Sequence, residues 1–155
     1  MGAQCMTTLV IDAGQSIVGI YSVEDGEYIG HRGSRISEAL ERVQNAEEVI
    51  TYCGEIYDLK QLGRFAGIDG EFPLRGKHTD MERMIWEPLP LGSSLERTYE
   101  RHFESCPDFP FGRRDSDDCD EYENSNQRDV YMTLKLWELW KDKKLDIVGY
   151  GYTHH

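Results

Sequence analysis

The sequence predicts an α/β domain built on a mixed five-stranded sheet with helices on both faces. Three observations lead to this fold class. The first third of the chain contains three β-branched, apolar segments separated by tight turns, the middle alternates between helical and strand patterns, and the last part is mainly helical. Short antiparallel strands followed by alternating helices and strands are typical of a mixed sheet that helices cover.

Length and composition predict one domain over residues 1–155 and no membrane-spanning segment. A chain of 155 residues can bury one substantial core, and no apolar run approaches the roughly 20 residues that cross a bilayer. The four cysteines form no C-x-x-C pair, and the first residues lack the basic and apolar regions of a signal peptide. We therefore expect a cytoplasmic protein with reduced thiols and no membrane partner, whose oligomeric state the sequence leaves open.

The first three strands are expected at residues 7–13, 16–23 and 27–33. Each is rich in β-branched and apolar residues, and the connections are only Gly14-Gln15 and Glu24-Asp25-Gly26. Connections this short predict an antiparallel meander.

The next helix is predicted to begin near Ser34 or Ser37, either of which can cap it, and to end near Asn45. Its apolar residues share one helical face. They are Ile36, Ala39, Leu40 and Val43. Residues 48–53 form a fourth strand that is apolar enough to be central, and residues 56–66 form a helix that Gly67 stops.

The second half of the chain predicts a short fifth strand at residues 77–81 that runs into a helix. Ser93 or Ser94 can cap a further helix that extends to Phe103. An acidic loop with proline and glycine is expected at about residues 107–126, before a closing helix over residues 127–141.

Three aspartates from distant segments are the candidate functional residues. Asp12 ends the first strand, Asp58 lies at the start of the helix after the fourth strand, and Asp129 opens the closing helix. Hydrolysis of a phosphodiester with metal ions needs several converging carboxylates, and oxygen ligands favour Mg²⁺ or Mn²⁺. The competing interpretations are a turn residue for Asp12 and acids favoured by the helix dipole for the other two.

The net charge of −12 argues against a broad nucleic-acid-binding face, because such a chain repels a polyanion at long range. Much of this charge is concentrated in the expected acidic loop. A local cleft elsewhere is therefore compatible with the composition.

Four short motifs resemble those of the DEDD-type 3′-5′ exonucleases of the ribonuclease H-like superfamily, most closely its YprB-like ribonuclease H group. They are Tyr52-Cys53-Gly54-Glu55-Ile56-Tyr57-Asp58-Leu59, His78-Thr79-Asp80, Ser94-Leu95 and Asp129-Val130. The resemblance implies a ribonuclease H-like fold and a metal-dependent exonuclease that acts on a single-stranded nucleic-acid end. It also implies that Asp12, Asp58 and Asp129 are catalytic and bind Mg²⁺ or Mn²⁺, with Glu55 or Asp80 as further candidate ligands.

The chain departs from this family at two places. The family has a second acid two residues after the first aspartate, where this chain has Gly14. It also has a tyrosine four residues, or a histidine five residues, before the last aspartate, where this chain has Ser125 and Asn124. Tyr122 is close in sequence and is expected to approach only if the loop reorganises. A catalytically inactive binding or assembly domain is therefore the alternative hypothesis.

A resolvase-like endonuclease is a further alternative. The segment Ile11-Asp12-Ala13-Gly14-Gln15-Ser16 before Val18-Gly19-Ile20 resembles the first hairpin of Holliday-junction resolvases and of actin-like sugar kinases. Those kinases bind nucleotide between two domains, and this chain is long enough for one.

Overall fold

The first three strands form the antiparallel meander that the sequence predicts. The computed structural model describes residues 6–86, 94–112 and 121–145. Strands β1 (Thr8–Ala13), β2 (Ile17–Ser22) and β3 (Glu27–Arg32) pair in chain order, and Asp12 of β1 lies opposite Gly19 of β2.

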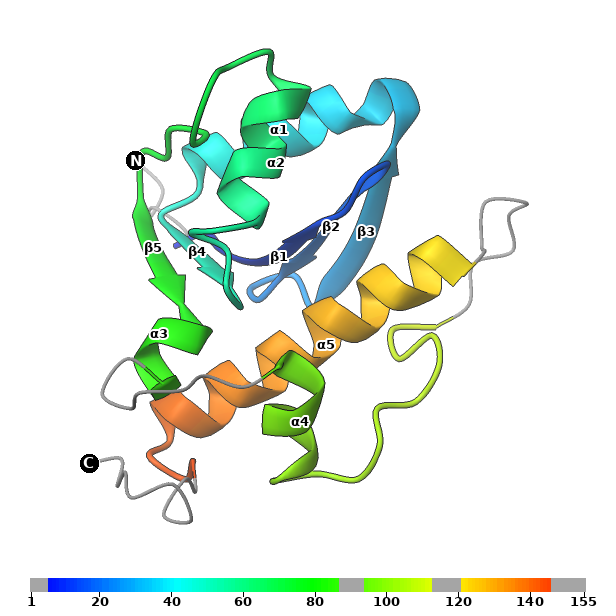
Figure 1. Cartoon of the computed structure of the whole chain (residues 1–155), viewed down its shortest axis with the longest axis vertical. Helices are drawn as coiled ribbons and strands as arrows, with labels where there is room; N and C mark the ends of the chain where they lie inside the picture. Colours follow the sequence, from blue (N-terminus) through cyan, green and yellow to red (C-terminus); the bar gives the residue numbers. More distant parts are fainter. Residues whose placement is uncertain (1–5, 87–93, 113–120, 146–155) are drawn as a thin grey trace.

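Two parallel strands extend the sheet on the other side of β1. Strand β4 (Glu48–Thr51) pairs with β1, and β5 (Lys77–Asp80) pairs with β4. The strand order is therefore β3-β2-β1-β4-β5 (Figure 1). The expected fold class is confirmed as an α/β arrangement with a mixed five-stranded sheet, consistent with a ribonuclease H-like fold.

One face of the sheet is covered by α1 (Ile36–Asn45) and α2 (Asp58–Phe65), which lie together in Figure 1. Side chains alternate between the faces of a strand, so Leu9 and Ile11 of β1 point toward these helices. They share a buried cluster with Val43 of α1 and Leu62 of α2. A short 3-10 turn, Gly33–Arg35, leads from β3 into α1.

The opposite face is covered mainly by α5 (Glu121–Lys141), which crosses the sheet (Figure 1). Val10 of β1 and Ile50 of β4 pack there against Val130 and Trp137 of α5. Helix α3 (Met81–Trp86) joins the same cluster, and α4 (Leu95–Glu100) packs on the outer side of α5. Asp12 lies two residues after Val10 in the same strand, so its side chain points to the same face of the sheet, the one that α5 covers.

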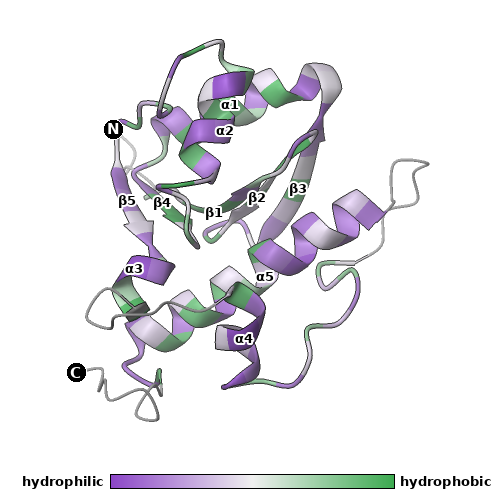
Figure 2. Cartoon of the chain, in the orientation of Figure 1, coloured by the Kyte–Doolittle hydropathy of each residue, from purple (hydrophilic) through white to green (hydrophobic). Residues whose placement is uncertain are grey.

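Helix α5 has two chemically different halves (Figure 2). Its C-terminal half supplies apolar side chains to the core, whereas its N-terminal half is hydrophilic. Three polar side chains of that first half are nevertheless buried. They are Glu123, Asn126 and Gln127. Buried polar groups require partners, so this half of α5 must be held by specific hydrogen bonds.

Several boundaries differ from the sequence-based predictions. Strand β4 ends at Thr51, two residues earlier than expected, and α4 ends at Glu100, before Phe103. The acidic loop was expected to reach residue 126, but α5 already begins at Glu121, and residues 113–120 lie outside the described part. Helix α2 begins at Asp58, two residues later than expected. Neither Ser34 nor Ser37 caps α1, because Arg35 holds the N-cap position without a side-chain bond. Ser94 does cap α4, by accepting a hydrogen bond from the backbone N–H of Arg97.

Within the described residues, no helix combines the length and the apolar character that a membrane-spanning segment requires.

The loop between β4 and α2 depends on two unusual backbone positions. A Cβ at Gly54 would lie 2.2 Å from Oγ1 of Thr51, so a larger residue does not fit there. The preceding residue, Cys53, has φ 62°, in the left-handed region that disfavours most side chains. Its backbone N–H donates to Oδ1 of Asp80 at 2.7 Å. The loop is thus strained at Cys53 and tied to the end of β5.

Replacement of Cys53 by asparagine should stabilise the protein by about 0.5 to 1 kcal/mol, because asparagine tolerates the left-handed region better than cysteine. Urea denaturation measures the change in the free energy of unfolding. The control, Cys53→Ala, also removes the thiol but keeps the strain, and should not gain stability. An alanine variant as stable as the asparagine variant would contradict backbone strain as the cause.

Candidate acidic site at the end of the sheet

Three structural elements place the predicted aspartates at one end of the sheet. Asp12 is the fifth residue of β1, near the carboxyl end of that strand. Asp58 is the first residue of α2, which follows the carboxyl end of the parallel strand β4. Asp129 lies within α5, on the face of the sheet toward which Asp12 points. Crevices in α/β folds commonly form at this edge, beyond the carboxyl ends of the strands.

Asp58 is anchored to the first strand. Its Oδ1 atom accepts a hydrogen bond from the backbone N–H of Ala13 at 2.8 Å, and the residue is only 4% exposed. This bond fixes the start of α2 against the end of β1. A charged carboxylate at this depth has one backbone donor on Oδ1 and little access to water.

Burial and nearby negative charges raise the pKa of all three carboxylates. Burial, followed by the charges of Asp58 and Asp129, raises the pKa of Asp12 well above its ordinary value, against a lowering by Asn126. Burial and the charges of Asp129 and Asp80 raise the pKa of Asp58 to about 7. Burial and the charge of Glu96 raise the pKa of Asp129 to about 6, although Arg128 opposes this shift. The site therefore concentrates negative charge that the protein itself only partly compensates.

A cavity of about 230 Å³, which we call the acid cavity, gives access to two of the three acids. Asp12 and Asp129 line it and are partly exposed. Gly14, Ser125 and Tyr122 form other parts of its wall. Since Asp58 is buried, a ligand that enters this cavity reaches Asp12 and Asp129 first.

Asn126 connects α5 to the first strand through a buried polar network. Its Nδ2 atom donates to the carbonyl oxygen of Asp12 at 2.9 Å and to Oδ2 of the same residue at 3.0 Å. Its Oδ1 atom accepts a hydrogen bond from the hydroxyl of Tyr28 at 2.6 Å. One carboxylate oxygen of Asp12 is therefore held by a neutral donor, and Asp12 is positioned from α5 as well as from its own strand.

The space for Asn126 exists because residue 19 is a glycine. A Cβ at Gly19 would lie 1.6 Å from Oδ1 of Asn126. The sequence carries a signal for this contact, since a glycine inside a strand often marks a close approach. A second signal was the position of Asn126 three residues before Asp129, which places both side chains on the same side of the helix.

The two residues at the family's activating positions have different surroundings. Ser125 lines the acid cavity. Asn124 is turned away from it, because its Oδ1 accepts a hydrogen bond from the backbone N–H of Phe109 and its Nδ2 donates to Asp108. Asn124 therefore holds the segment before residue 113 against α5.

Tyr122 reaches the acid cavity without the loop reorganisation that we expected from the sequence. It lies in α5, seven residues before Asp129, which is close to two helical turns. Its side chain is 58% exposed and lines the cavity that contains Asp12 and Asp129. The expectation was wrong because it assumed a loop where the helix has already begun.

The two additional candidate ligands have other contacts. Asp80 is buried and accepts hydrogen bonds from the backbone N–H groups of Cys53, Glu55 and Glu82, so it fastens the loop between β4 and α2. The carboxylate of Glu55 forms an ion pair with Arg83. Asp80 still affects the site, because its charge contributes to the raised pKa of Asp58.

No group of three or more His, Cys, Asp or Glu side chains that could hold a metal ion is present in the described part of the chain. The charges of Asp58 and Asp129 raise the pKa of Asp12, yet the three side chains do not converge as a formed coordination site. Their oxygen donors and their uncompensated charge nevertheless suit a hard divalent cation.

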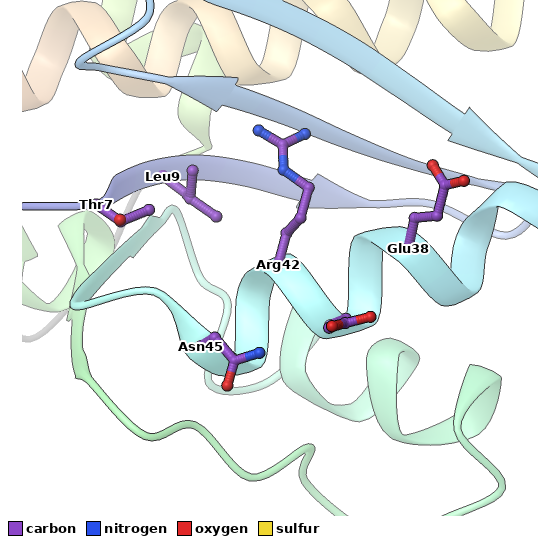
Figure 3. Close-up of a pocket in the computed structure, with 6 residues that line it drawn as sticks. Thr7, Leu9, Glu38, Arg42 and Asn45 are labelled. Atoms are coloured by element: carbon purple, nitrogen blue, oxygen red, sulfur yellow. The ribbon is translucent and has the colours of Figure 1, made fainter. Parts of the chain in front are cut away.

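A separate cavity of about 360 Å³ lies on the α1 face of the sheet (Figure 3). Thr7 and Leu9 line it from the first strand and its approach, and Glu38 and Arg42 line it from α1. Figure 3 shows Arg42 extending from α1 toward the neighbouring strands, where Nη1 lies 3.4 Å from Nε2 of His31. None of the three aspartates lines this cavity.

No protein-family model matches the sequence, and a search of curated proteins gives no match. Function must therefore be inferred from the residues of the site and from the motif resemblance.

The metal-free protein should lose stability as the pH rises from about 4 to about 7. The pKa values of Asp58 and Asp129 are raised in the folded state, so the folded chain holds protons that the unfolded chain releases near pH 4. The stabilisation is fully present below the pKa that these carboxyl groups have in the unfolded chain. It is lost as the pH rises through the pKa that they have in the folded protein. Urea denaturation in EDTA at several pH values measures it.

Two variants test the assignment to the buried acid. Asp58→Asn removes a charge that must be buried above pH 7, and should flatten the pH dependence. Asp142→Asn, at an exposed position near the end of α5, should leave it unchanged. Equal pH profiles for wild type and Asp58→Asn would contradict the electrostatic description of the site.

Proposed function

We propose that the protein is a divergent metal-dependent 3′-5′ exonuclease-like domain, related to the DEDD exonucleases of the ribonuclease H-like superfamily, that acts on nucleic-acid phosphodiesters in the cytoplasm. One observation carries the proposal. Carboxylates from β1, α2 and α5 lie at one end of the sheet, where Asp58 is buried and Asp12 and Asp129 are partly exposed. The charges of Asp58 and Asp129 raise the pKa of Asp12, and the charge of Asp129 raises the pKa of Asp58. A structural role gives no reason to gather such charges, whereas a divalent cation would compensate them.

Asp12, Asp58 and Asp129 would hold Mg²⁺ or Mn²⁺. The ion would supply Lewis-acid stabilisation of the phosphodiester and of the attacking water. Asp12 and Asp129 face the cavity, and the Asp58 carboxylate lies behind them on the N–H of Ala13. Binding would require the three side chains to draw closer together, which the loss of mutual repulsion would favour.

Tyr122 and Ser125 form the cavity wall from α5, on the same side as Asp129. A tyrosine hydroxyl in this position could orient a water molecule by hydrogen bonding. Tyr122 is therefore the candidate for the helper role that the family assigns to a residue before the last aspartate.

The second candidate function is a non-catalytic binding or assembly domain. It is favoured by Asn126, whose amide already satisfies one oxygen of Asp12 without a metal. The glycine at position 14, in place of the family's second acid, points in the same direction. The two candidates differ in one measurable property, which is whether the acids bind a divalent cation.

Mn²⁺ should stabilise the protein by about 2.7 kcal/mol at a hundredfold excess over its dissociation constant, because only the folded state brings the acids together. Thermal denaturation with and without Mn²⁺ measures the effect. Asp58→Asn should abolish it, whereas Asp142→Asn should retain it. An unchanged melting temperature in Mn²⁺ for the wild type would support the non-catalytic candidate.

The wild type should degrade end-labelled single-stranded DNA or RNA in Mn²⁺, and Asp58→Asn should reduce the rate by at least about a hundredfold. A 5′ label combined with a 3′ label gives the direction of degradation. A circular single strand should stay intact, and its cleavage would instead indicate a resolvase-like endonuclease. Equal rates for wild type and Asp58→Asn would exclude these acids as the active site.

Replacement of Gly14 by glutamate should increase both Mn²⁺ affinity and hydrolysis, by about tenfold or more, because it adds a carboxylate at the rim of the acid cavity. The position accepts a side chain, since a Cβ at Gly14 would lie 3.4 Å from Cγ2 of Ile17, an ordinary contact. The matched control is Gly14→Gln, which has the same shape without the charge. Equal gains for both variants would rule out a missing ligand as the cause.

A further inference from the structure

A second cavity, distinct from the one on the α1 face, adjoins the acid cavity and has different chemistry. Its volume is about 210 Å³, and it shares residues 13–15, at the β1–β2 turn, with the acid cavity. Its other side is formed by the turn before α2 and by the first two turns of that helix. The two cavities are thus neighbouring compartments on either side of one hairpin tip.

The second cavity exposes two large apolar side chains. Ile56 is 57% exposed and Tyr57 is 67% exposed, and both line the cavity. Tyr57 directly precedes Asp58, so its backbone is fixed by the same loop that delivers the buried acid. A solvent-exposed aromatic ring beside a cavity is a suitable surface on which a planar group can stack.

The same cavity carries local positive charge in a chain of net charge −12. Lys60 and Arg64 are one helical turn apart on α2, so both lie on the side that lines the cavity. Among the ion pairs of the described residues, neither has a carboxylate partner. Nη1 of Arg64 donates to Gln61 at 3.3 Å, which leaves its charge uncompensated.

The size of the cavity favours one unit of a polymer over a complete small ligand. Pockets for whole small molecules typically measure about 300 to 1,000 Å³, which exceeds this cavity. A polymer whose units each carry a planar ring and a phosphate matches the aromatic ring and the two cations. The shared residues 13–15 allow one unit to occupy this cavity while the neighbouring unit enters the acid cavity.

We infer that this second cavity binds the nucleotide next to the reacting phosphodiester of a single-stranded nucleic acid, with the base stacked on Tyr57 and the phosphates bound by Lys60 and Arg64. The inference rests on the proposed function for the identity of the polymer. A single strand is required because a base in a duplex has no free face for Tyr57. The cations also explain how a chain of net negative charge holds a polyanion, since attraction at short range outweighs screened repulsion from distant charges.

The test is binding of a fluorescein-labelled single-stranded oligonucleotide, measured by fluorescence anisotropy in EDTA at low salt. Without a metal no hydrolysis occurs, so binding is separated from catalysis. Tyr57→Ala should weaken binding by at least about fivefold, whereas Tyr57→Phe, which keeps the ring, should bind like the wild type. These side chains are exposed, so folding should be unaffected, and melting curves verify this.

The cations are tested by the salt dependence of the affinity. Each phosphate contact on a single strand contributes about 0.7 to the slope of log affinity against log salt concentration, so the double variant Lys60→Ala with Arg64→Ala should lower the slope by about 1.4. The control, Lys143→Ala with Lys144→Ala, removes the same charge from exposed positions beyond α5 and should leave the slope unchanged.

Each result decides between the alternatives. The inference is overturned if the wild type does not bind, if the two double variants bind equally, or if an acidic peptide of equal charge binds as tightly as the oligonucleotide. Asp58→Asn should retain binding in EDTA, because it removes only a negative charge. If the wild type binds in EDTA but does not hydrolyse the strand in Mn²⁺, the proposed enzyme is refuted while this cavity is supported. Wild-type hydrolysis that is unaffected by substitution of Tyr57, Lys60 and Arg64 would do the reverse.

Discussion

Burial of negative charge at one end of the sheet is the constraint on which the rest of this structure depends. A carboxylate removed from water must be protonated, hydrogen-bonded or paired with a cation. Asp58 has the N–H of Ala13 and Asp12 has the amide of Asn126, whereas Arg128 offsets part of the charge at Asp129. These partners only partly stabilise the charged carboxylates, so the pKa values of Asp12 and Asp58 remain raised.

The first half of α5 is built to approach this charged end of the sheet. Gly19 removes the side chain that would meet Asn126, and the hydroxyl of Tyr28 completes the amide's hydrogen bonding. The second half of the same helix uses apolar packing against β1 and β4. One helix therefore fixes the position of Asp129 through the core and approaches Asp12 through a polar contact. This division explains why the hydrophilic part of α5 is nevertheless partly buried.

The β1–β2 turn separates two compartments with complementary properties. One contains the acids Asp12 and Asp129, and the other contains Tyr57 with the cations of α2. In the proposed reaction the two cavities would complement each other, because acids that attract a metal ion also repel the phosphates of a polyanion. Positive side chains in the neighbouring cavity reduce that repulsion without neutralising the acids. The overall charge of −12 is thus compatible with a local nucleic-acid site.

The sequence by itself determined the strands and the order of the helices, because local periodicity and short turns fix these features. It did not determine which side chains meet. Asn126 bonds to Asp12 across 114 positions and to Tyr28 across 98, and Glu55 pairs with Arg83 instead of joining the acids. Such contacts depend on how α5 and the loop before α2 pack on the sheet. Only the tertiary structure decides them, because each is set by long-range packing that no local pattern encodes.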